Sequence, residues 1–323
     1  YQKNLDNYGF RITSEKYQLV TQGPTNHQTQ VRDLLNQDLI GLEDVLQSDV
    51  LTIFGPIRPG LENTIRNTIE RVRNRRGRIA VVLDTVGGIV EVVERMVTVI
   101  RHHYNEVDFL VPDRAMSAGT VFVMAGNQIY MNYFSCLGPI DPQIERDGRF
   151  VPAMSYLNQY QRLHERAESG QLNTAELILL NNFDPGELYQ FEQARLLSQD
   201  LLADWLSTYK FRDWDTHSST GSPVTAEEKT ERAEEIAKVL GDYERWRSHG
   251  RAISRDTLAS DPIRLKIERI EDNPNLSVAL DYYFKSLEYY MSFFISSEHD
   301  LFVHTRNVLR RFAARPSRAR SSN

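Results

Sequence analysis

Short apolar strands alternate with amphipathic helices in the first half of the chain, and this alternation limits the possible folds more than any other feature. We predict strands at 50–54, 79–84, 107–111 and 128–131, with helices at 60–76, 89–104 and 117–125 between them. Because consecutive parallel strands need a crossover that is usually a helix, this order predicts a mostly parallel sheet with right-handed crossovers. The strands are almost continuously apolar, which favours burial on both faces. We therefore expect an α/β core at residues 48–150.

The segments outside this core are predicted to be mostly helical. Four are distinguished by composition and apolar spacing: an N-terminal helical arm at 1–47, a helical insertion at 151–206, a helical C-terminal region completing the site at 207–312, and a basic disordered tail at 313–323. Runs of like charge are usually solvated. The Tyr- and Phe-rich helices of the C-terminal region, which include Tyr282 and Tyr289, either cover the core or form an interface between subunits.

Composition excludes several classes of function. The net charge of −6 argues against a general nucleic-acid binder. The single cysteine, Cys136, allows no intrachain disulfide, which fits a reducing, cytoplasmic environment. No secretory signal is found, and no run approaches the ~18 apolar residues of a membrane span. Without an HExxH, CxxC, Walker or GxGxxG pattern, we expect neither a metal site nor a nucleotide cofactor.

Ser117 is the candidate nucleophile because of its neighbours in the sequence. It lies between small residues where the helix 117–125 begins, and the pair Gly87-Gly88 follows the strand 79–84. The start of a helix offers free backbone N–H groups and the positive end of the helix dipole, and the glycine pair can supply further N–H groups. These are the parts of a nucleophile and an oxyanion hole. The alternative is that Ser117 only caps its helix and the glycines only form a tight turn.

Three short segments carry a resemblance to a known family: the Gly87-Gly88 turn, Met116-Ser117-Ala118-Gly119, and Leu137-Gly138-Pro139-Ile140-Asp141-Pro142-Gln143. In order and spacing they resemble the Clp-protease/crotonase superfamily, and most of all its serine dehydrogenase proteinase and signal-peptide-peptidase-A branch. The resemblance covers about 50–150 and implies a β-α spiral core. It also implies a peptide-bond hydrolase that forms homo-oligomers, with Ser117 as nucleophile. The oxyanion hole would include Gly87, Gly88 and Ala118, with the N–H groups of Gly88 and Ala118 as donors.

The general base remains open at this stage. Clp-type proteases have a histidine about 25 residues after the serine, but this chain has Asp141 in that stretch and no histidine. Asp141 is a candidate orienting acid, or it forms an Asx-type turn before Pro142. The signal-peptide-peptidase branch uses a lysine deprotonated by burial. Here the first lysine after Lys16 is Lys210, in the apolar setting of Tyr209 and Phe211.

Two histidines compete with Lys210 as the base. His217 could be held by Asp213 or Asp215, and His249 is the third candidate. We therefore predict a soluble serine endopeptidase in which Ser117 forms an acyl-enzyme, with Lys210 or a histidine as base. Its substrates would be peptides or proteins.

Two other classes of function are kept open. One is a non-catalytic, Clp-like scaffold or binding protein. The other is a crotonase-type acyl-CoA enzyme, whose oxyanion hole would stabilise an enolate. The acids nearest that hole, Glu91 and Glu94, share a helix with Arg95, which is typical of a solvated face.

Overall fold

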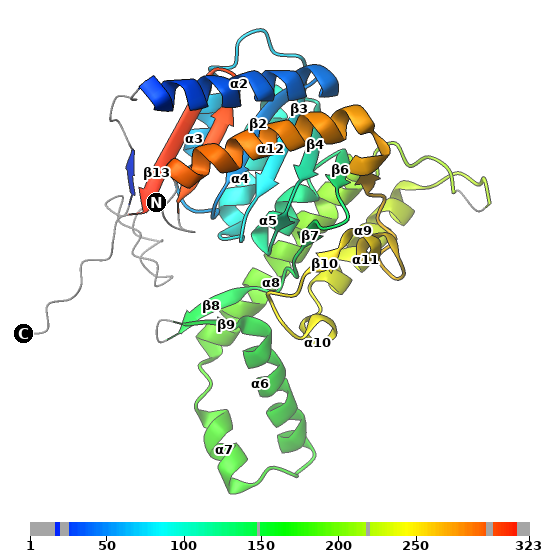
Figure 1. Ribbon diagram of the computed structural model, residues 1–323. Coiled ribbons are helices and arrows are strands. Elements are labelled where there is room, and N and C mark those ends of the chain that lie inside the picture. The colour runs from blue at the N-terminus through cyan, green and yellow to red at the C-terminus, as the bar shows by residue number, and fades with distance from the viewer. Residues whose placement is uncertain (1–16, 20–25, 147–148, 218–219, 295–299, 315–323) are drawn as a thin grey trace, which may run out of the picture.

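A computed structural model describes residues 17–19, 26–146, 149–217, 220–294 and 300–314. Among them, eight strands form one sheet in the order β1-β13-β12-β2-β3-β4-β6-β11 (Figure 1). The parallel part contains β2 (Asp49–Phe54), β3 (Arg78–Asp84), β4 (Glu106–Val111), β6 (Gln128–Met131) and β11 (Glu268–Arg269). The predicted α/β class with a mostly parallel sheet is confirmed.

Helices cover both faces of the sheet, as its apolar strands require. On one face, α3 (Leu61–Ile69), α4 (Val90–His103) and α5 (Ala118–Val123) pack against inward residues such as Val81 and Leu83. On the other face, α2 (Asn26–Leu46) and α12 (Pro274–Phe294) pack against Val50 and Val82. Successive residues of one strand thus belong to two separate cores.

Residues 151–206, predicted as a helical insertion, project from the body as an arm (Figure 1). The hairpin of β8 (Gln143–Arg146) and β9 (Arg149–Pro152) leads into α6 (Ala153–Glu168), α7 (Thr174–Asn181) and α8 (Pro185–Trp205). The end of α8 returns to the body, where Leu202 and Trp205 join the core. It continues into the π-helix η3 (Leu206–Lys210).

The remaining elements follow the arm in sequence, apart from two strands of a small second sheet. They are α9 (Ala226–Leu240), α10 (Tyr243–Trp246), α11 (Arg255–Ala259), the 3-10 helix η4 (Ile270–Asp272), and a small sheet of β5 (Arg114–Ala115), β7 (Cys136–Leu137) and β10 (Ile253–Ser254). None of the described helices has both the length and the apolar character needed to cross a membrane.

The prediction that residues 207–312 are helical is wrong at their C-terminal end. After α12 the chain forms β12 (Leu301–Thr305) and β13 (Val308–Ala314), which pair antiparallel with each other, and β12 pairs with β2. All five residues of β12 are buried, because β12 occupies the edge that β2 would otherwise expose. β13 also pairs with β1 (Tyr17–Leu19) and includes the first two residues of the predicted tail. The rest of that tail, 315–323, lies outside the described residues, as do 1–16 of the arm.

Arg306, in the turn between β12 and β13, fastens this hairpin to the N-terminal part of the sheet. Its Nη1 lies 2.9 Å from both carboxylate oxygens of Glu43, at the end of α2, and 2.6 Å from Oδ1 of Asp49 in β2. Both carboxylate side chains are only 2% exposed. The hydroxyl of Tyr104 donates to the other oxygen of Asp49 at 2.8 Å. One guanidinium therefore balances two buried carboxylates.

We expect Arg306→Met to lower the free energy of unfolding by about 3–5 kcal/mol, because it leaves two buried carboxylates without their cation. Chemical denaturation of the whole chain measures this. The matched control is Lys238→Met, which removes an exposed cation 3.9 Å from Glu234 and should cost less than about 1 kcal/mol. Equal losses in the two variants would contradict the structural role given to Arg306.

Candidate active site

Ser117 lies in a strained turn between β5 and α5. Its backbone has φ 54° and ψ −119°, a region that residues other than glycine rarely adopt. Its side chain makes no cap hydrogen bond to α5, and Oγ has no hydrogen-bond partner among the described residues. The helix-cap alternative for Ser117 is therefore not what the structure shows. The turn holds a free hydroxyl at the start of a buried helix.

The Gly87-Gly88 turn after β3 packs directly against the Ser117 turn. Backbone hydrogen bonds from Thr85 N–H to the Arg114 carbonyl and from Met116 N–H to the Thr85 carbonyl, each 3.0 Å, join the two segments. A Cβ atom on Gly87 would lie 2.8 Å from Cβ of Ser117, and one on Gly88 would lie 1.8 Å from the carbonyl oxygen of Ile57. Both glycines also have positive φ, 95° and 150°. Only glycine fits this approach of two backbones.

Two of the three residues predicted for the oxyanion hole keep a free donor. Within the part of the chain that the structure describes, the N–H groups of Gly88 and Ala118 have no hydrogen-bond acceptor. The N–H of Gly87 donates to Oγ1 of Thr85 at 3.0 Å, so Gly87 is not a free donor and the prediction is corrected for it. Gly87 instead allows the close contact with Ser117. The positive end of α5 points at the same place.

The segment that follows β7 also packs against the Ser117 turn. Oγ1 of Thr120, in α5, lies 2.8 Å from the carbonyl oxygens of Ala115 and Gly138, and the N–H of Gly138 donates to it at 3.0 Å. A Cβ on Gly138 would lie 2.7 Å from Cε of Met116, the residue before Ser117. Thr120 thus fixes the segment that follows β7 against the Ser117 turn. Nothing in the sequence had singled out Thr120.

This segment brings Asp141 to His249. Because β10 pairs antiparallel with β7, the chain before Ile253 runs back along the chain after Leu137. Nδ1 of His249 lies 3.0 Å from Oδ1 of Asp141, whose side chain is fully buried, while the His249 side chain is 14% exposed. Oδ2 of Asp141 has no hydrogen-bond partner in the described chain. The structure therefore places Asp141, the candidate orienting acid, against His249, the third of the candidate bases.

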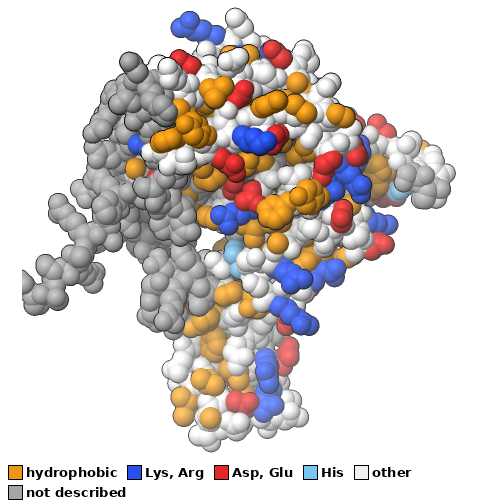
Figure 2. All heavy atoms as spheres, in the orientation of Figure 1, with side chains coloured by type: hydrophobic (Ala, Val, Ile, Leu, Met, Phe, Trp, Pro, Cys, Tyr) orange, Lys and Arg blue, Asp and Glu red, His pale blue; other side chains and the backbone are white. Residues whose placement is uncertain are grey.

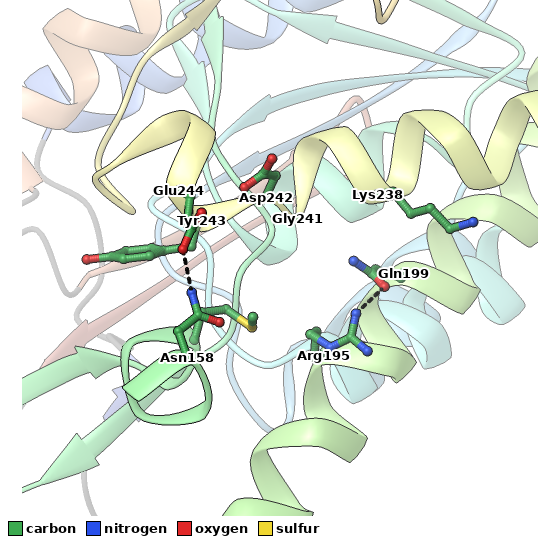
Figure 3. A pocket seen from close by; sticks show the side chains of 9 residues that line it. Asn158, Arg195, Gln199, Lys238, Gly241, Asp242, Tyr243 and Glu244 are labelled. Carbon is green, nitrogen blue, oxygen red and sulfur yellow. Dashed lines mark hydrogen bonds between the residues drawn. The ribbon is translucent and has the colours of Figure 1, made fainter. Parts of the chain in front are cut away.

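A cavity of about 400 Å³ lies between the arm and helices α9 and α10 (Figure 3). Its lining side chains come from α6, α8, α9 and α10 and include Asn158, Arg195, Lys238 and Glu244. The N–H of Ile140 donates to the Leu240 carbonyl, and the Pro142 carbonyl accepts from the N–H of Ala153. Residues 140–142 therefore connect the cavity wall to the His249–Asp141 pair.

The structure does not bring Lys210 to Ser117. Nζ of Lys210 lies 3.2 Å from the Asn127 carbonyl oxygen and 3.2 Å from Oε1 of Gln128, where β6 begins. Helix α5 begins directly after Ser117 and ends close to the start of β6. Ser117 and Lys210 therefore lie at opposite ends of α5. Burial lowers the pKa of Lys210 to about 8, as predicted for an apolar setting, but the predicted Ser117–Lys210 dyad is absent.

His217 is also held elsewhere. Its Nε2 lies 3.2 Å from Oε1 of Glu228, in the first turn of α9, and its ring packs edge-on against Trp214. Neither predicted carboxylate, Asp213 or Asp215, holds it: Asp213 pairs with Arg212 and Asp215 with Lys229. Arg212 in turn pairs with Glu106 at the start of β4. The start of β4 lies at the edge of the sheet opposite Ser117. His217 therefore helps to hold the first turn of α9 in place.

Asp84, the last residue of β3, is a titratable group that sequence reasoning missed. Burial and the nearby carboxylate of Asp113 raise the pKa of Asp84 to about 7, and Arg114, 3.8 Å away, opposes this only in part. The described residues include no group of three or more His, Cys, Asp or Glu side chains that could hold a metal.

Comparison with known proteins finds a protein family that matches part of this chain. Residues 49–206, just under half of the chain, match the model of the family described as ClpP-like SDH-type serine proteinase. The resemblance predicted from the glycine turn, the Ser117 segment and residues 137–143 is therefore confirmed. The match supports a serine peptidase.

Individual relatives cover only parts of the chain. One uncharacterized protein of Methanocaldococcus jannaschii is 28% identical over 115 residues, which is 36% of this chain and 36% of that protein. A second from the same organism is 35% identical over 66 residues, 20% of this chain and 23% of that protein. The matches thus span about a third or less of these curated relatives.

The solved structures found include two variants of the 1510-N membrane-bound stomatin-specific protease. One is 21% identical and covers 44% of this chain and 74% of the other, with a TM-score of 0.29. The second, in complex with a substrate peptide, is 22% identical and covers 34% and 55%, also with a TM-score of 0.29.

Gly87→Ala should lower the rate at which Ser117 reacts with a fluorophosphonate by roughly 100-fold, because the added methyl group displaces the Ser117 turn from the oxyanion donors. Intact-mass spectrometry over time gives the rate. Gly60→Ala is the matched control: its φ is 93°, close to that of Gly87, but no atom lies within 4 Å of its added Cβ. If both variants lose the same amount of reactivity, backbone strain alone explains the effect.

Proposed function

We propose that this chain is a serine peptidase in which Ser117 attacks a peptide carbonyl and the N–H groups of Gly88 and Ala118 bind the oxyanion. The observation that carries the proposal is the free hydroxyl of Ser117 in a strained turn, packed against a glycine turn and beside two unused backbone donors. Strain and unused donors in a buried region cost stability, and they persist where function requires them. The family match to serine proteinases supports the same reaction.

We further propose His249 as the general base and Asp141 as its positioning residue. The carboxylate accepts a hydrogen bond from Nδ1–H of His249, which fixes the tautomer that leaves Nε2 free to take a proton. Ser117 and His249 are not hydrogen-bonded to each other in this structure, and such bonds often form only with substrate bound. The antiparallel pairing of β7 and β10 supports His249 over Lys210 and His217, which lie at the other edge of the sheet.

The reaction then proceeds in two balanced steps. In the first, Oγ of Ser117 bonds to the substrate carbonyl carbon while its proton moves to His249 Nε2. The tetrahedral oxyanion forms beside the Gly88 and Ala118 donors, and collapse breaks the C–N bond as His249 returns the proton to the leaving amine. In the second, water attacks the acyl-enzyme with His249 again as base, which releases the acid and restores Ser117.

The crotonase-type alternative needs carboxylates next to the oxyanion hole. Glu91 and Glu94 of α4 are both exposed to solvent. They have the exposure expected of a solvated helix face, which argues against this alternative.

Peptides or proteins remain the proposed substrates, and the cavity beside residues 140–142 is the proposed location of a substrate side chain.

Fluorophosphonate labelling tests the nucleophile. We expect one adduct on the wild-type chain and none on Ser117→Ala, because Ser117 combines a free hydroxyl with adjacent backbone donors. Ser169→Ala, at an exposed serine at the end of α6, is the control and should label like wild type. Hydrolysis of a fluorescent casein should follow the labelling. An adduct that persists in Ser117→Ala would overturn the proposal.

The base is tested by four variants in the same assay. His249→Gln and Asp141→Asn should slow labelling by about 10²–10⁴-fold, because proton transfer from Ser117 loses its acceptor or the orientation of that acceptor. Lys210→Met and His217→Gln should stay within about threefold of wild type. The reverse pattern among the four variants would restore Lys210 or His217 as the base.

A further inference from the structure

The segment between α10 and β10 carries two arginines, one on each side of His249. Arg247 and Arg251 are both exposed to solvent. In the described part of the chain, neither guanidinium group forms an ion pair or a hydrogen bond. We call these two residues the arginine pair. Neither the packing of the fold nor the proposed proton transfer accounts for their two charges.

The acidic side chains next to the arginine pair already have other donors. Oδ1 of Asp242 accepts a hydrogen bond from a backbone N–H of α10 at 3.0 Å. Oε1 of Glu244 accepts from Nδ2 of Asn158 at 3.5 Å. Asp141 is buried and holds the proposed base. The arginine pair therefore keeps its positive charge on a chain whose net charge is −6.

The backbone around His249 brings the arginine pair close to the proposed base. Arg247 has φ 62°, a left-handed conformation that glycine or asparagine usually adopts at the end of a helix. An arginine in this conformation carries backbone strain, and such strain gathers at functional sites. Each arginine is two residues from His249, and two residues span at most about 7 Å. The guanidinium groups can therefore reach a molecule bound beside His249.

The small sheet places Arg251 at the same end as Ser117. Ala115 pairs with Leu137, which also pairs with Ile253. β5 and β7 are parallel and β10 is antiparallel to them, so the chain after Ala115 and the chain before Ile253 leave the sheet at one end. Ser117 and Arg251 each lie two residues beyond these pairs. Since neighbouring strands are about 4.8 Å apart, the two chains are separated by about 10 Å there, the length of about three residues of an extended peptide.

A guanidinium group without a counter-ion is suited to bind a carboxylate. Its planar arrangement of N–H donors matches the two oxygens of a carboxylate, and the charged hydrogen bonds strengthen the contact. The cavity between the arm and α9 offers no comparable pair. Its Arg195 lies 2.6 Å from Glu192, and its Lys238 lies 3.9 Å from Glu234. The arginine pair is therefore the better site for an acidic group of a substrate.

The surroundings favour a short acidic peptide over a nucleic acid. Figure 2 shows Lys and Arg side chains in the region where Figure 1 places α10 and β10, with Asp and Glu side chains close to them. Exposed Asp242 and Glu244 lie directly before the arginine pair. A nucleic-acid surface neutralises many successive phosphates with an array of Lys and Arg. Acids this close would repel a long polyanion but leave room for one or two carboxylates.

We propose that the arginine pair binds acidic side chains of the peptide substrate, within about three residues of the bond that is cleaved. The substrates of this chain are then acidic peptides or acidic segments of proteins. This proposal rests on the peptidase function proposed above and adds the substrate class to it. Arg247 and Arg251 determine specificity and take no part in breaking the bond.

Peptide binding to the whole Ser117→Ala chain tests the proposal without cleavage. Fluorescence anisotropy compares a dansyl-labelled octapeptide of four Glu-Ala repeats with one of four Gln-Ala repeats. We expect the acidic peptide to bind about tenfold more tightly at low salt, and less so at high salt. Adding Arg247→Gln or Arg251→Gln should weaken its binding about threefold each, and the two together should remove the preference.

The matched control is Arg71→Gln in the same Ser117→Ala chain. Arg71 is also exposed and without an ion pair among the described residues, but it lies between α3 and β3, at the edge of the sheet opposite Ser117. This variant should keep the full preference for the acidic peptide. Replacing both Arg247 and Arg251 by glutamate should reverse the preference, so that an octapeptide of four Lys-Ala repeats binds more tightly than the acidic one.

Several outcomes would overturn the arginine pair as an acidic-peptide site. They are equal affinity for the Glu and Gln peptides, a preference that survives loss of both arginines, and an equal loss in Arg71→Gln. Displacement of the acidic peptide by a lower concentration of a thymidylate octamer would identify a nucleic-acid site instead. Because no peptide is cleaved, this test is separate from the labelling of Ser117. Absence of labelling overturns the peptidase, whereas absence of the preference overturns the arginine pair.

Discussion

The close approach of two backbone turns is the constraint on which the candidate site depends. The glycine turn after β3 and the Ser117 turn before α5 touch where any side chain larger than hydrogen would collide with the other backbone or with Ile57. This contact fixes the Ser117 backbone in its unusual conformation and leaves the Gly88 and Ala118 N–H groups without acceptors. The parallel strands β3 and β4 provide the register that brings the two turns together, and the helices on both faces keep these strands buried.

The second element of the site depends on a small sheet outside the main one. β7 lies between β5, which precedes Ser117, and β10, which follows His249. One short strand therefore links the proposed nucleophile to the proposed base, although they are 132 positions apart in the sequence. Thr120 reinforces this link by binding the segment after β7 to α5.

The outer parts of the chain complete the sheet and cover it. β12 and β13 extend the sheet beyond β2, and Arg306 ties their turn to two buried carboxylates from α2 and β2. α2 and α12 then cover one face and turn a second apolar stripe outward. Among the aromatic C-terminal residues, Tyr283 and Tyr290 face the core, whereas Tyr282 and Tyr289 face outward.

The sequence by itself determined the α/β class, the four parallel strands and three helices expected between residues 50 and 131, and the expectation that Ser117 lies near the glycine turn. These follow from local periodicity, from the conformational freedom of glycine and from residues close together along the chain. Only the tertiary structure brought Asp141 to His249, the proposed general base, since these two residues are paired by strand register across a long separation, while Lys210 has the predicted apolar setting at the other edge of the sheet. The same holds for β12 and β13: their residues become strands because β2 offers an open edge, a condition that no local sequence pattern contains.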